Sequence, residues 1–173
     1  MQTTENLGPI EGRDIIYCPD TGLVTFTSKG DCDCDGPGGS LEMDPDWQPT
    51  TSLRWLNPVT KKIEYIDSCV VPGVVVPPVI IKRTAKIVLG CLCGVSFDGG
   101  PWIQGVVYDS GPPDKIGEDS WGMHKLLGTG ANPRSGIEGF TRLRYRLYTG
   151  IPATGIKCVD GVVRSFALQR FGS

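Results

Sequence analysis

Glycine and proline interrupt this chain so often that no long helix fits between them. The 173 residues include 24 glycines and 14 prolines, which recur without a fixed period. Both residue types end regular elements and favour turns, so their density predicts short strands joined by tight turns. The most apolar stretch, residues 70–81, contains Pro72, Pro77 and Pro78. We therefore expect no transmembrane helix and no membrane partner.

The rest of the composition is that of one globular domain. Hydrophobic residues make up 39% of the chain and charged residues 21%, which are ordinary proportions for a soluble domain and exclude a disordered chain. The length also suits one domain rather than two. We expect residues 1–14 to form a flexible N-terminal segment and residues 15–173 to form a single domain, present as a monomer.

Apolar alternation and turn residues predict roughly eight short strands. The expected strands cover residues 15–18, 23–27, 74–81, 86–92, 102–108 and 142–148, with two more between 50 and 66 and a last one from residue 162. One helix is expected over residues 120–127, because Asp119 or Ser120 can cap its start and Gly128 can end it. The pattern predicts a mainly β fold with one or two short helices, arranged as a compact β-barrel or sandwich.

Charge is divided unevenly along the chain. Residues 1–60 carry ten acidic and three basic side chains, whereas residues 61–173 carry nine acidic and fourteen basic ones. A nucleic-acid-binding chain would be basic throughout, so we expect no nucleic-acid partner and favour a cationic partner for the first third.

Seven cysteines are many for a chain of this length. They are Cys18, Cys32, Cys34, Cys69, Cys91, Cys93 and Cys158. Zinc sites prefer two to four residues between paired cysteines, whereas the close pairs here are separated by one, so we expect one to three disulfides rather than zinc. Disulfides indicate extracellular action. The first twenty residues nevertheless lack the basic start and apolar run of a signal peptide.

The segment 108–128 contains the residues best suited to catalysis. Asp109 follows an apolar strand, Glu118 precedes the expected helix, and glycines and prolines between them force a turn. Hydrolysis of a glycosidic bond needs two carboxyl groups across a cleft, one to protonate the leaving oxygen and one to activate water. The same two acids are also compatible with a solvated loop that caps the helix.

The order of motifs in this chain resembles that of glycoside hydrolase family 75, the fungal-type chitosanases. The run Asp109-Ser110-Gly111-Pro112, followed by Gly117-Glu118-Asp119-Ser120 and Leu127-Gly128, is similar to the family signature D-x-G-P, G-E-x-S, L-G. Further similar segments lie at residues 33–36 (D-C-D-G), at 44–51 (D-P, Q, T) and at 133–136 (P-x-x-G), with Ile137 where the family has a second glycine.

This resemblance implies a function and a finer fold. It implies a double-psi-like barrel with a six-stranded core and internal, inverting hydrolysis of β-1,4-linked glucosamine in chitosan. Glu118 then acts as the general acid and Asp109 as the general base, and no cofactor is needed. Chitosan is cationic where its amines are protonated, so acidic side chains suit its groove. The substrate-binding candidates are Asp31, Asp33, Asp35 and Asp119, with Trp102 or Trp47 for sugar stacking.

Other functions remain open at this stage. Residues 31–42 match the calcium-loop pattern with Asp31, Asp33, Asp35 and Glu42, although strands and prolines stand where helices should flank it. The alternatives are therefore a non-catalytic module that binds carbohydrate or polycations, and a calcium-stabilised structural domain. His124 is expected to be structural rather than the partner of a catalytic cysteine. Residues 142, 144 and 146 are three alternate arginines, which indicate a solvated strand face rather than a phosphate site.

Overall fold

The architecture is taken from a computed structural model, which describes residues 2–57, 59–137 and 142–166. The fold is mainly β with two short helices, as the sequence predicts. Nine strands form one mixed sheet in the order β1-β2-β3-β11-β8-β9-β7-β10-β4. They are β1 (Glu5–Asn6), β2 (Ile16–Cys18), β3 (Leu23–Ser28), β4 (Asp31–Asp33), β7 (Gly73–Val76), β8 (Cys91–Phe97), β9 (Trp102–Ser110), β10 (Glu118–Ser120) and β11 (Leu143–Pro152).

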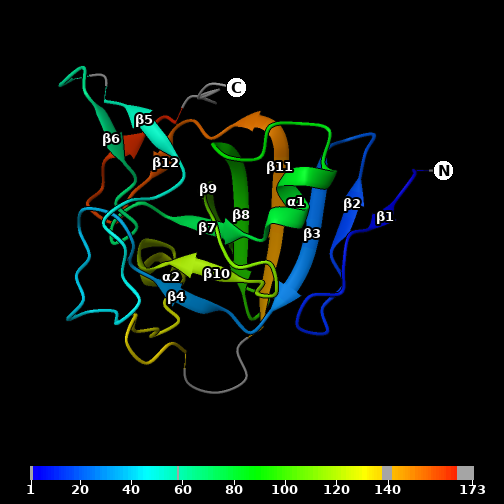
Figure 1. Ribbon diagram of the computed structural model, residues 1–173, viewed down its shortest axis with the longest axis horizontal. Helices are drawn as coiled ribbons and strands as arrows, with labels where there is room; N and C mark the ends of the chain where they lie inside the picture. The colour runs from blue at the N-terminus through cyan, green and yellow to red at the C-terminus, as the bar shows by residue number, and fades with distance from the viewer. Residues whose placement is uncertain (1, 58, 138–141, 167–173) are drawn as a thin grey trace.

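The prediction of a closed six-stranded barrel is wrong. The short strands β1 and β4 lie at opposite edges of the sheet, and they do not pair with each other in the described part of the chain. Figure 1 shows the sheet spread between these edges, with β4 at the left and β1 at the right. Most neighbours are antiparallel, but β7 runs parallel to β9 and β10 runs parallel to β4. A closed barrel needs pairing between its first and last strands, and these edges do not supply it.

Two small antiparallel pairs lie outside the main sheet. The hairpin of β5 (Arg54–Leu56) and β6 (Ile63–Tyr65) projects from one end of the molecule, and β12 (Ile156–Lys157) pairs with β13 (Val163–Arg164) nearby (Figure 1). The last strand, predicted from residue 162 onward, forms only at Val163–Arg164 within the described residues. The part of that prediction after residue 166 lies outside the described residues.

Proline converts part of one predicted strand into a helix. Residues 74–81 were expected to be extended, but β7 ends at Val76 and α1 covers Pro78–Arg83. Proline suits the first turn of a helix because its φ is already helical and its missing N–H is not needed there. The strand expected at residues 86–92 is displaced toward the C-terminus and becomes β8. Conversely, α2 (Trp121–Leu127) follows the sequence prediction: Ser120 Oγ accepts from Met123 N at 3.0 Å, and Gly128 ends it with φ of 68°.

Residues 5–10, which precede β2, pack against the rest of the domain. Glu5 pairs with Tyr17 across the sheet edge, and Leu7 and Ile10 are buried in the core. All seven cysteines are buried and free, so none of the predicted disulfides is present. Their thiols pack as small apolar groups, and burial raises the pKa of Cys91 to about 12. No helix in the described ranges is long and apolar enough to cross a membrane.

The strand β7 lies between two hydrophobic cores. Val74 and Val76 pack in the larger core with Tyr145 and Met123, whereas Val75 faces the second core with Tyr108. This alternation follows from the pleat, which turns successive side chains to opposite faces. The side of β7 on which Val75 lies is also the side that carries the candidate site.

Candidate functional site

Asp109 and Glu118 flank the same residue of β7. Val75 pairs with Asp109 of β9 on one side and with Glu118 of β10 on the other. Residues paired across neighbouring strands point to the same face, and neighbouring strands lie about 4.8 Å apart. The two acids thus lie two strand spacings apart, which is about 9.6 Å between Cα atoms in a regular sheet. The β7–β9 register shifts between Val74 and Val75, and Asp109, Glu118 and Val75 all line the same pocket. The sequence predicts this pairing of acids, and the sheet provides the geometry.

The turn between the two acids depends on a glycine. Gly117 has φ of 82°, and a Cβ at this position would lie 2.2 Å from the Cβ and Oγ of Ser28. Ser28 Oγ in turn donates to Ile116 O at 3.0 Å, and Asp31 N donates to Gly117 O at 2.8 Å. The close packing of β3 and the turn thus fixes where β10 begins, and with it the position of Glu118.

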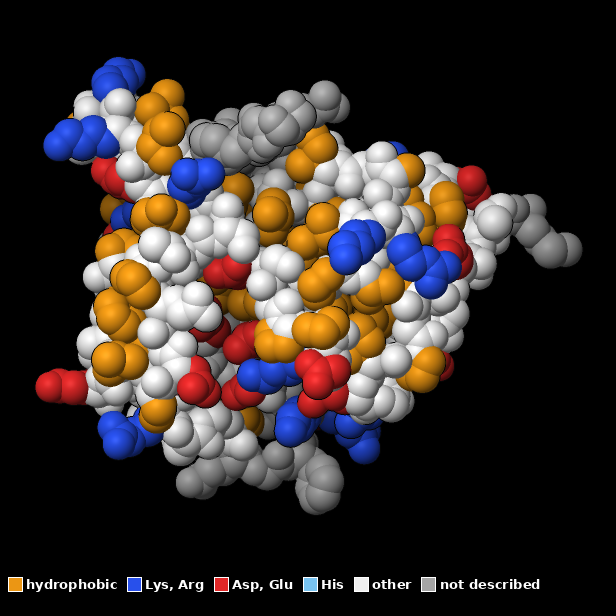
Figure 2. Space-filling view, in the orientation of Figure 1, with side chains coloured by type: hydrophobic (Ala, Val, Ile, Leu, Met, Phe, Trp, Pro, Cys, Tyr) orange, Lys and Arg blue, Asp and Glu red, His pale blue; other side chains and the backbone are white. Residues whose placement is uncertain are grey.

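Both acids line a pocket of about 590 Å³, which we call the acidic pocket. Figure 2 shows acidic side chains gathered in a hollow near the centre of the view. Its ionisable lining residues are Asp33, Asp35, Asp44, Asp46, Asp109, Glu118 and Lys115. Six carboxyl groups against one ammonium group in this lining make the pocket suited to a cationic ligand.

Asp109 is held by three hydrogen bonds to one oxygen. Its Oδ1 accepts from Ser52 N at 3.1 Å, from Ser110 N at 2.7 Å and from the Ser52 hydroxyl. Burial raises the pKa of Asp109, and these hydrogen bonds oppose the shift because they stabilise the carboxylate. The arrangement fixes the side chain and leaves Oδ2 without a contact from these donors.

Glu118 shares a lysine with Asp31. Lys115 Nζ lies 2.6 Å from Asp31 Oδ2 and 3.2 Å from Glu118 Oε1. Burial raises the pKa of Glu118, Lys115 lowers it, and the charges of Asp31 and Asp109 raise it again, so the net direction is upward. The ammonium of Lys115 is closer to Asp31 than to Glu118, so its charge is shared between the two carboxylates.

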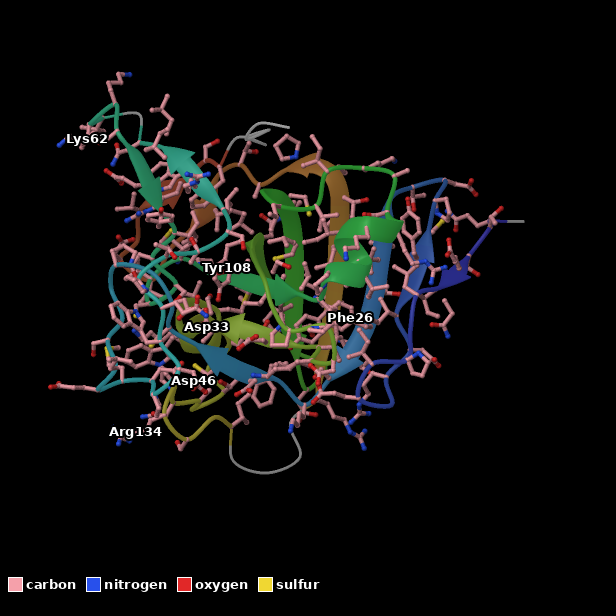
Figure 3. The ribbon with its side chains drawn as sticks, in the orientation of Figure 1. Phe26, Asp33, Asp46, Lys62, Tyr108 and Arg134 are labelled. Atoms are coloured by element: carbon pink, nitrogen blue, oxygen red, sulfur yellow. The ribbon has the colours of Figure 1, made fainter. Side chains whose placement is uncertain are left out.

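A tyrosine binds a third acid inside the acidic pocket. The hydroxyl of Tyr108 donates to Asp33 Oδ2, and Asp35 N donates to Asp33 Oδ1 at 3.1 Å. Figure 3 shows Tyr108 and Asp33 labelled close together, with Asp46 labelled just below Asp33 in this view. Burial is the largest cause that raises the pKa of Asp33 to about 8, and that of Asp35 to about 6. At neutral pH Asp33 is therefore mostly protonated.

Two of the predicted substrate-binding acids lie outside this pocket lining. Asp31 pairs with Glu118 across β4 and β10, but its side chain contacts Lys115. Asp119 pairs with Val74, on the opposite face of the sheet, and is fully buried. Its Oδ2 accepts from Tyr145 Oη at 2.6 Å. The period of two along β10 explains the separation, because Glu118 and Asp119 must point to opposite faces.

The two tryptophans proposed for sugar stacking also lie outside this lining. Trp102 begins β9, at the end far from Asp109, and the guanidinium of Arg146 lies 4.1 Å from its ring centroid. Trp47 Nε1 donates to Gly36 O at 3.0 Å, next to Asp46 and Gln48, which do line the pocket.

The acidic loop does not take the form of a calcium loop. Residues 31–33 form the strand β4, and the carboxylates at positions 31, 33 and 35 contact Lys115, Tyr108 and the Gln48 amide respectively. Within the described ranges no group of three or more His, Cys, Asp or Glu side chains is placed to hold a metal ion. His124 is buried beside Asp31 O and Thr129 Oγ1, at 2.9 and 3.0 Å, consistent with a structural side chain.

Sequence reasoning missed three charged residues of the acidic pocket. Asp44 and Asp46 reach it from a loop that is remote from β9 and β10 in sequence, and Lys115 lies in the turn between the two central acids. Asp44 was part of the family resemblance and Asp46 was not, and no local pattern shows that this loop lines the same pocket as Asp109 and Glu118.

No family model matches this chain, and no curated protein matches it. The resemblance to the family 75 chitosanases therefore depends on the quoted motifs and their order.

Proposed function

We propose that this protein is a glycoside hydrolase that cleaves β-1,4 glucosamine linkages within chitosan chains, with inversion at the anomeric carbon. The observation that carries the proposal is the placement of Asp109 and Glu118 on the same face of two strands that flank β7. Inverting glycosidases hold their carboxyl groups about 6.5–9.5 Å apart to admit a water molecule, whereas retaining enzymes hold them at about 5–5.5 Å. The strand β7 lies between the two acids, which keeps their backbones two strand spacings apart and supports the wider, inverting separation.

The chemistry of the lining supports a cationic sugar polymer. Six carboxyl groups surround the position that a sugar chain would occupy, and Lys115 is the one cation in this lining. Asp33 and the proposed acid Glu118 are protonated near neutral pH, so the attraction comes from the other four. Protonated glucosamine units carry one ammonium group each, so they would be attracted along the acidic pocket. Chitosan is a polymer too large to enter a cell, and the proposal therefore places the reaction outside the cell that makes the protein.

The proposed roles follow from the surroundings of each acid. Asp109, whose carboxylate form is stabilised by hydrogen bonds from Ser52 and Ser110 against the effect of burial, takes a proton from the attacking water, whose oxygen bonds to the anomeric carbon. Glu118, whose pKa is raised by burial, donates its proton to the leaving glycosidic oxygen as the old bond breaks. Lys115 works against this second role, and its pairing with Asp31 limits that effect.

The test is product formation from chitosan, with NMR of the new anomers. We expect the α-anomer to appear first, and Asp109→Asn and Glu118→Gln to abolish cleavage. Asp114→Asn is a matched control, because this exposed acid lies in the same turn but not in the pocket lining. Initial β-anomer, or full activity in either variant, would contradict the mechanism. Binding of chitosan by the folded wild type without cleavage would instead indicate a binding module.

A further inference from the structure

A basic surface occupies a part of the sheet that the proposed function does not use. Five cationic side chains line two adjoining hollows of about 700 and 530 Å³. They are Arg13, Lys29, Arg142, Arg144 and Arg146, which we call the basic face. The hollows share Arg13, Thr27 and Arg144, and neither shares a lining residue with the acidic pocket.

Two of these side chains, Arg144 and Arg146, come from β11, and the other three come from segments outside the strands. Arg144 and Arg146 alternate along β11 with buried residues, so both point outward. β11 lies between β3 and β8, and β9 follows β8, as Figure 1 shows. Arg146 thereby pairs with Thr25 on one side and Gly94 on the other. On this surface β11 contributes the two arginines, β3 contributes Thr25 and Thr27, and β9 contributes Trp102.

The cations of the basic face lack acidic partners among the described residues. None of the five is in an ion pair there, although Asp14 and Asp98 line the hollows. Arg144 instead donates to Ser96 Oγ at 3.1 Å. Exposed cations that are not neutralised locally attract anions, and several together favour an anionic polymer.

Trp102 holds the arginines in place. A Cβ on Gly94 would lie 3.3 Å from Trp102 Cε3, so the missing side chain lets the indole ring lie against the sheet. The guanidinium groups of Arg146 and Arg144 lie 4.1 and 5.4 Å from the centre of the ring. The ring thereby supports Arg146, whose side chain is exposed to solvent.

We infer that the basic face binds single-stranded nucleic acid. Arg144 and its basic neighbours would contact successive phosphates, and the exposed plane of Arg146, supported by Trp102, would stack on a base. Unpaired bases stack on guanidinium planes as well as on aromatic rings, and basic grooves follow the phosphate backbone. A sulfated polysaccharide has the charge but no planar base, so the supported guanidinium favours nucleic acid. The distribution of charge along the sequence does not reveal this surface, and for that reason no nucleic-acid partner is expected from the sequence alone.

The test is binding of fluorescein-labelled oligothymidylate of twenty nucleotides, measured by anisotropy over a range of salt concentrations. We expect Arg144→Gln/Arg146→Gln to weaken binding at least tenfold and to reduce the slope of log K against log salt by about 0.7, because only Arg144 of this pair contacts a phosphate. Lys61→Gln/Lys62→Gln removes the same charge from the β5–β6 turn and should change the affinity little. Equal loss in both pairs, or no binding by the wild type at 50 mM salt, would overturn the inference.

Two further measurements separate stacking from charge. Trp102→Leu keeps every charge, and we expect it to weaken oligothymidylate binding without changing the salt slope. Dextran sulfate matched for charge should compete poorly, since it offers phosphate-like anions without bases. If it competes as well as oligothymidylate, the nucleic-acid inference is wrong. Melting curves of each variant exclude loss of fold as the cause.

Discussion

Lys115 is the side chain that most directly opposes the role proposed for Glu118. Its ammonium lowers the pKa of Glu118, while burial and the charges of Asp31 and Asp109 raise it. The general acid must carry a proton at the start of the reaction, so activity falls as pH rises through this pKa.

Replacing Lys115 should therefore shift the pH profile in a defined direction. In Lys115→Met the pKa of Glu118 rises, and we expect the alkaline limb of kcat/KM on chitosan to move to higher pH. The profile is measured by reducing-end release across pH, with Lys82→Met on α1 as the control. A shift of the alkaline limb to lower pH would contradict the assignment of Glu118 as the acid.

Asp33, in the same pocket, makes the stability of the folded protein depend on pH. Burial raises its pKa from 3.8 to about 8, so between these values the folded state holds a proton that the unfolded state has released. The free energy of unfolding consequently decreases as pH rises through this window, by up to about 1.4 kcal/mol per pH unit for one group. Asp33→Asn should flatten this dependence. Urea unfolding at several values between pH 4.5 and pH 8 checks it, and a dependence as steep in Asp33→Asn as in the wild type would contradict it.

At the scale of elements, the sequence predicted strands well where the local pattern decides them. The alternation in Leu143–Leu147 and the cap at Ser120 act over a few neighbours, and β11 and α2 formed as expected. The strand expected at residues 74–81 failed because Pro78 begins a helix. The barrel failed for a different reason: strand order depends on contacts between distant residues, which no local pattern encodes.

In the candidate site, too, the sequence predicted what local spacing decides and not what contacts between distant segments decide. Asp109 and Glu118 are close in sequence, and the turn between them indicated that they meet. Asp119 was misplaced because the exact start of β10 decides which of two adjacent acids faces the pocket. Asp44 and Asp46 join the pocket only through the folding of a remote loop.

The turn before β10 offers a test of how the element positions the site. Gly117→Ala would place a Cβ against Ser28 at a positive φ, and we expect it to lower the free energy of unfolding by at least about 2 kcal/mol and to reduce kcat. Gly12→Ala is the matched control: its φ is 70°, but a Cβ there has open space, so about 1 kcal/mol is expected. Chemical denaturation measures both. Equal losses would mean that backbone strain alone, and not the contact with Ser28, matters.

At the scale of the whole molecule, charge of opposite sign is separated into two surfaces. The acidic pocket gathers six carboxyl groups, and the basic face gathers five cations around the outward side of β11. The net charge of −2 conceals this separation. In the proposed function, carboxylates that do not react attract the cationic polymer, so part of the affinity for chitosan should depend on ionic strength.

Asp44 and Asp46 allow that dependence to be measured apart from the chemistry. Neither flanks Val75, so Asp44→Asn/Asp46→Asn should raise KM for chitosan about threefold to tenfold at low salt while kcat changes less. Added salt screens the remaining charges, so KM of the wild type should rise toward that of the variant. Asp20→Asn/Asp114→Asn removes the same charge outside the pocket lining and serves as the control. If both pairs raise KM equally, the attraction comes from net charge and the acidic pocket has no special part in it.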